Sequence, residues 1–126
     1  MFKALLPLAA LVTVSAVHAQ EMAPPLEIPA LTIEQQANLR CGVAFAFVAS
    51  QQDSGVAWAL ELPAMEPRGK EFFVRTMAQI MEDERFTRDV MTVLLTEQAT
   101  SMGEEGADRL QGIMPACLSL LDASGL

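Results

Sequence analysis

The chain has 126 residues, of which 52% are hydrophobic and 19% charged, and 16 acidic residues against eight Lys and Arg give a formal net charge of −8. This length allows one domain, and the hydrophobic fraction is too high for an intrinsically disordered chain. The acidity argues against nucleic acid as a partner, because phosphate binding needs a basic surface.

Residues 1–19 have the pattern of a cleaved signal peptide: a basic start, an apolar run up to Val17, and small residues around Ala19. The alternative is a membrane anchor, but the run is short for a span of about 20 residues and contains Pro7. Cleavage would also remove His18, the only histidine, and with it Ser-His, Cys-His and His-zinc sites. We therefore expect a periplasmic or secreted protein without a stable membrane anchor after cleavage.

Residues 20–31 contain three prolines and predict an extended leader before a single domain over residues 32–126. Thr32 and Gln35 fit a capping box, which predicts that a helix begins here and runs to about residue 50. The second half of this helix is apolar nearly all round, which is typical of the central helix of a bundle. Its apolar stripe at helical spacing consists of Ile33, Ala37, Cys41, Ala44, Phe45 and Val48, widened by Val43 and Phe47.

Residues 56–62 (VAWALEL) are compatible with a short helix or a strand, and the lone Trp58 either covers the core edge or forms part of a groove. Residues 63–70 carry two prolines and a glycine, which predicts a connector. A helix is expected over residues 71–84. Its apolar face consists of Phe73, Met77, Ile80 and Met81, with Phe72 beside it.

Thr87 can cap a fourth helix, on which Val90, Val93 and Leu94 recur at helical spacing. Gly103 and Gly106 predict a turn, followed by a last helix over about residues 107–122. Pro115 should kink or split that helix. The apolar face of the last helix consists of Leu110, Ile113, Met114, Cys117, Leu120 and Leu121. Together these elements predict an all-α fold, a small bundle of four or five helices.

Two cysteines, Cys41 and Cys117, remain in the expected mature chain. An even number in an exported protein favours a disulfide, and two cysteines allow one intramolecular pairing. Their separation of 76 residues is unlike any CxxC redox or zinc motif. Because both lie on apolar faces, the bond should join the first and last long helices.

Chemical sites are weakly indicated. Met77 and Met81 could ligate copper, although core packing is the commoner role of methionine. The acidic runs 82–84 and 104–108 lack the spacing of a calcium loop and are better explained as solvated surface. The sequence has no nucleophile elbow, P-loop or dinucleotide fingerprint. We therefore expect no enzyme activity, no metal and no cofactor.

Three stretches, LRCGVAFAFVAS, RGKEFFVRTMAQIMED and MPACLSLLD, resemble small exported helical proteins of alphaproteobacteria that carry one cysteine pair. The resemblance implies an exported helical domain with paired cysteines and brings no catalytic residue with it. The architecture alone is also similar to that of the periplasmic acid-stress chaperones.

The sequence thus favours a non-enzymatic periplasmic protein that acts through contacts with other envelope proteins, in an envelope-stress or chaperone-like role. The alternative is a small-ligand binding module with an aromatic-lined pocket formed by Trp58, Phe72 and Phe73. Exposed apolar surface between helices would favour the first, and a closed pocket with converging polar groups would favour the second.

Overall fold

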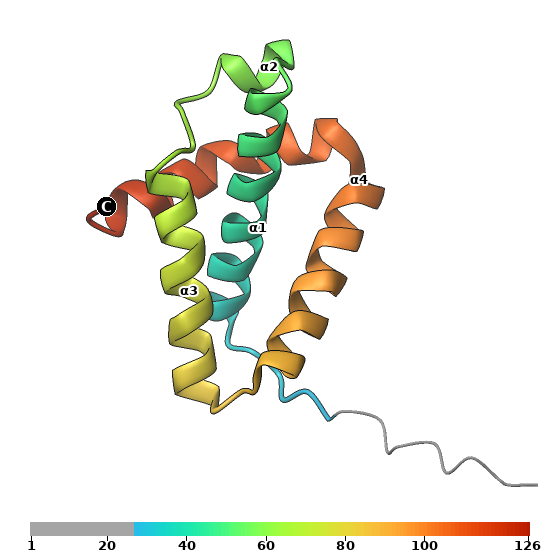
Figure 1. The fold of residues 1–126 in the computed structure, drawn as a ribbon, viewed down its shortest axis with the longest axis vertical. Helices are drawn as coiled ribbons and strands as arrows, with labels where there is room; N and C mark the ends of the chain where they lie inside the picture. Colours follow the sequence, from blue (N-terminus) through green and yellow to red (C-terminus); the bar gives the residue numbers. More distant parts are fainter. Residues whose placement is uncertain (1–26) are drawn as a thin grey trace, which may run out of the picture.

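Residues 27–126 are described by a computed structural model (Figure 1). The fold of this part is all-α, as predicted, and contains four helices: α1 (Ile33–Asp53), α2 (Ala57–Leu60), α3 (Arg68–Glu84) and α4 (Arg88–Ala123). The predicted signal peptide and residues 20–26 of the predicted leader lie outside the described residues. Residues 27–31 form neither helix nor strand. No helix within residues 27–126 is both long and apolar enough to cross a membrane.

Helix α1 is the central element and begins as predicted. The Thr32 side chain accepts a hydrogen bond from the backbone N–H of Gln35, and the Gln35 side chain accepts one from the backbone N–H of Thr32. Ile33 was expected on the apolar stripe but is 87% exposed, because burial along α1 begins only at Leu39. The buried residues of α1 are Leu39, Cys41, Gly42, Val43, Ala44, Phe45 and Val48.

The sequence of residues 56–62 was compatible with a helix or a strand. The structure has one helical turn, α2, in this segment. The side chain of Gln52 holds this segment in place. Its amide NH₂ donates to the carbonyls of Ala59 and Pro63 at 3.0 and 2.9 Å, and its carbonyl accepts from the backbone N–H of Met65 at 3.0 Å. One side chain thereby ties the end of α1 to the backbone of α2 and of the connector that follows it.

Helix α3 begins at Arg68, three residues before the expected start. Pro67 was interpreted as part of a connector, but a proline at this place suits a helix start, where its missing N–H has no helical partner. The predicted apolar face is confirmed at Met77 and Ile80, but the two phenylalanines exchange places on it. Phe72 is buried and meets Phe45 of α1 edge-to-face at 5.3 Å between ring centroids, whereas Phe73 is half-buried.

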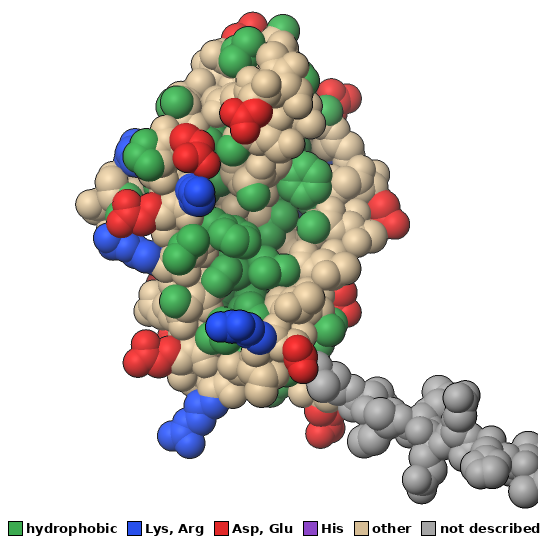
Figure 2. All heavy atoms as spheres, in the orientation of Figure 1, with side chains coloured by type: hydrophobic (Ala, Val, Ile, Leu, Met, Phe, Trp, Pro, Cys, Tyr) green, Lys and Arg blue, Asp and Glu red, His purple; other side chains and the backbone are tan. Residues whose placement is uncertain are grey.

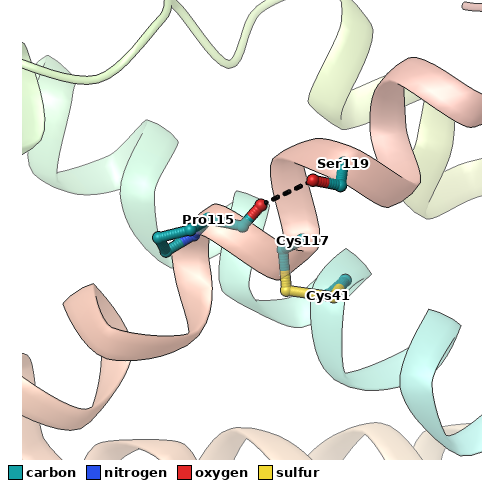
Figure 3. Close-up of a disulfide and its surroundings, with 4 residues drawn as sticks. All are labelled: Cys41, Pro115, Cys117 and Ser119. Carbon is teal, nitrogen blue, oxygen red and sulfur yellow. Dashed lines mark hydrogen bonds between the residues drawn. A yellow bond between two sulfur atoms is a disulfide. The ribbon is translucent and has the colours of Figure 1, made fainter.

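Helix α4 confirms one prediction and narrows another. The expected break at residues 103–106 is present at Gly106, whose φ of 83° and ψ of 176° are not helical and divide α4 into two helical halves, whereas Gly103 stays helical. Pro115 does not split the helix, since its backbone remains helical. The carbonyl of Gln111, which loses its N–H partner to the proline, belongs to an exposed residue. The Ser119 hydroxyl donates to the Pro115 carbonyl at 3.1 Å (Figure 3).

The predicted disulfide is present. Cys41 of α1 and Cys117 of α4 are joined, with 5.1 Å between their Cα atoms (Figure 3). Figure 1 shows the C-terminal half of α4 crossing α1, and the disulfide fixes the two helices to each other covalently. Helix α3 packs along another side of α1, and the N-terminal half of α4 stands on the opposite side from α3 (Figure 1).

Candidate functional site

An apolar groove opens between α1, α3 and the N-terminal half of α4. Its volume is about 340 Å³. Figure 2 shows hydrophobic side chains gathered in the middle of this face, over α1, with charged side chains around them. We call this feature the groove, and it is lined by Val43, Ala46, Phe47, Ser50, Phe73, Leu95 and Ala99.

The floor of the groove is one stripe of α1. Val43, Ala46, Phe47 and Ser50 follow the i, i+3, i+4, i+7 spacing that places side chains on one helix face. Ala46 and Ser50 are exposed, although neighbouring turns of α1 are buried. The small side chains at these two positions leave room for another molecule to approach the α1 backbone.

The walls of the groove come from two different helices. Phe73 of α3 packs closely against α1, since a Cβ atom at Gly42 would lie 3.3 Å from Phe73 Cδ2. Leu95 and Ala99 form the opposite wall and are half-buried, one turn apart on α4. Ser50 is the one polar residue of the lining, so the groove offers almost entirely apolar contacts.

A second hollow of about 160 Å³ adjoins the groove at Phe47, which lines both. We call it the Trp58 hollow. Trp58 is half-buried and belongs to α2, the turn that the Gln52 side chain holds against α1. The Trp58 hollow is lined by Phe47, Gln51, Trp58, Met102, Gly103, Gly106, Ala107 and Leu110.

The three aromatic residues singled out in the sequence lie in different places. Phe73 lines the groove, Trp58 lines the second hollow, and Phe72 lines a more polar hollow together with Arg75 and Leu126. Phe72 and Phe73 are adjacent on α3 and are therefore turned about 100° apart. The structure thus does not gather the three side chains into one aromatic-lined pocket.

The other chemically interesting residues serve the fold. Met77 is buried in the core, and Met81 packs half-buried against it. Glu105 accepts from Arg40 at 3.0 Å and from Arg109 at 3.2 Å, which places part of an acidic run in ion pairs. Within residues 27–126, no three His, Cys, Asp or Glu side chains come together as metal ligands would.

Sequence analysis missed most of the groove, namely Ala46, Ser50, Leu95 and Ala99. One signal was available for the floor, because on the face shared by Val43 and Phe47 the small residues Ala46 and Ser50 lie one helical turn apart. For the α4 wall there was no such signal, since Leu95 and Ala99 resemble ordinary core positions of an amphipathic helix.

No protein-family model, no curated protein and no solved structure matches this chain. The function is therefore argued from the groove itself.

Proposed function

We propose that this protein acts in the periplasm as a non-enzymatic binding protein, and that it holds an apolar segment of another envelope protein in the groove. The observation that supports the proposal is the groove's composition: six of its seven lining residues are apolar, and they come from three helices. An open apolar groove on a small protein is the kind of surface that partners bind.

The periplasmic part of the proposal has two supports. The Cys41–Cys117 disulfide fits an oxidising compartment, where such bonds persist. The residue pattern of positions 1–19 fits a signal peptide. Mass spectrometry of a periplasmic fraction should find a chain that begins at Gln20. A full-length chain that stays in the membrane fraction would contradict this part.

Site-specific photo-crosslinking in intact cells tests the binding part. A photoreactive amino acid replaces Ser50 in the groove and, as the matched control, the exposed Ala78 of α3, which does not line the groove. We expect discrete adducts with envelope proteins from position 50 and none from position 78. Adducts of equal yield from both positions, or none from position 50, would count against the groove.

The chaperone-like form of this function can be tested in vitro. The oxidised protein should slow the aggregation of an unfolded periplasmic client, and Ala46→Gln should remove that effect by placing an amide across the apolar floor. Ala78→Gln provides a control of the same size and polarity change. Suppression that is identical in both variants would place the activity outside the groove.

A further inference from the structure

The partner class follows from the shape and charge of the site. We infer that the groove and the Trp58 hollow together receive an amphipathic helix with basic residues flanking its apolar face. This inference rests on the proposed function and specifies its partner.

The length of the site suits about two helical turns. The groove and the Trp58 hollow adjoin at Phe47, and their α1 lining extends from Val43 to Gln51. At 1.5 Å per residue, these positions cover about 12 Å of the helix axis. Apolar side chains at positions i, i+4 and i+7 of a bound helix cover about 10 Å and would reach both hollows.

The lining also distinguishes a helix from an extended segment. Apart from Gly106 at the break in α4, every lining residue lies in a regular helix, whose backbone groups are paired internally, so the site offers no strand edge for strand addition. An extended segment would bring unpaired N–H and C=O groups onto apolar side chains, which is costly. A helix satisfies its own backbone and presents only side chains to the groove.

Small residues allow that helix to approach closely. Ala46 on α1 and Ala99 on α4 line the groove, and Gly103 and Ala107 line the Trp58 hollow. A Cβ atom at Gly103 would meet nothing within 4 Å, which shows open space above this position. Small residues and open space at these positions leave room for large apolar side chains of the partner.

Charge indicates which residues should flank the apolar face. The chain carries twice as many acidic as basic residues. Exposed Glu104 and Asp108 directly follow Gly103 and Ala107 in sequence, and the ion pairs of residues 27–126 use Glu71, Glu105 and Asp122 instead. Figure 2 draws both acidic and basic side chains around the hydrophobic ones, so the attraction for Lys or Arg on the partner comes from the net negative charge of the chain together with Glu104 and Asp108, and it would speed the encounter.

The test uses three synthetic helical peptides of about 15 residues with the same leucine stripe and with Lys, Gln or Glu at the flanking positions. They contain no tryptophan, so the fluorescence of Trp58, the only tryptophan of the chain, reports occupancy of its hollow. We expect the Lys peptide to bind about tenfold more tightly than the Gln peptide and the Glu peptide to bind most weakly. In about 0.5 M salt, the differences should shrink.

Two controls locate the binding. A Lys peptide of the same composition with the leucine stripe scrambled should bind weakly, because its apolar side chains no longer share a face. Ala46→Gln should lower the affinity for the striped Lys peptide about tenfold or more, whereas Ala78→Gln should not change it. Both positions are exposed, so neither variant disturbs the core.

Each result that differs from these expectations would overturn a specific part of the inference. Equal affinity for all three peptides would overturn the basic partner and leave the groove as a binding site. Failure of every peptide, with photo-crosslinks still formed from position 50, would overturn the helical partner but not the proposed function. Self-association in sedimentation, lost in Ala46→Gln, would assign the groove to a second copy and overturn the inference.

Discussion

The two halves of α4 are held in different ways, although they belong to one element. The half after Gly106 is bound to α1 through the Cys117 disulfide. It is also bound to α3, because Arg68 pairs with Asp122 at 3.0 Å and donates to the carbonyl of Leu126 at 2.8 Å. Its buried apolar residues are Leu110, Met114, Cys117 and Leu121.

The half before Gly106 is held more weakly. Met91 and Met102 are its buried residues, while Leu95 and Ala99 remain half-buried in the groove wall. Its ion pair with α1 joins Arg40 to Glu105, the residue directly before the kink. One helix therefore has two roles: the half after Gly106 anchors α4 to α1, and the half before it forms a wall of the groove. The change of direction at Gly106 separates the two halves.

Removing the disulfide should have the largest effect. In the chain-entropy model, a bond that closes a loop of this length contributes about 4 kcal/mol to the free energy of unfolding. Urea unfolding of a Cys41→Ser/Cys117→Ser double variant, compared with the oxidised protein, measures the difference. An unchanged midpoint would show that the anchor half is held by packing alone.

Truncation of one apolar side chain in each half tests the comparison directly. Met114 is 1% exposed, so Met114→Ala should cost about 3 kcal/mol of stability through lost burial and a cavity. Leu95 is half-buried, and Leu95→Ala should cost about 1 kcal/mol. Chemical unfolding of both variants gives the two values. Equal costs would mean that the halves are anchored alike.

Replacing each of the two glycines near the kink by alanine should change the stability of the protein in opposite directions. Gly106 has φ 83° and ψ 176°, a region that is essentially restricted to glycine, so Gly106→Ala should cost about 2 kcal/mol. Gly103 is helical with open space above it, and Gly103→Ala should stabilise the protein by about 0.5 kcal/mol. Thermal unfolding of the pair tests this, and destabilisation by both substitutions would contradict it.

The ion pair before the kink should have the smallest effect. Arg40 and Glu105 are about a third exposed, at 33% and 37% of their side-chain surface, so solvent weakens the attraction. A double-mutant cycle with Arg40→Gln and Glu105→Gln should give a coupling energy of about 0.5 kcal/mol that falls with added salt. A coupling several times larger would make this pair a principal support of the wall.

Local patterns predicted the helices, and the tertiary features could not be predicted in the same way. The Thr32–Gln35 box and the apolar spacing of α1 are local, and the oxidising context made the Cys41–Cys117 bond the expected pairing. The start of α3 was misplaced because Pro67 ends some structures and begins others. The groove depends on where the adjacent Phe72 and Phe73 each meet α1 and on the position of the half of α4 before Gly106, and both are set by packing between distant segments.

The disulfide also determines what a protease could do to this molecule. Every residue that lines the groove or the Trp58 hollow lies between Cys41 and Cys117 in sequence, inside the covalent loop that the bond closes. A single backbone cut in the connector between α2 and α3 would leave two pieces that stay tethered. Their effective concentration for each other remains high, so the nicked protein should keep a formed groove until the bond is reduced.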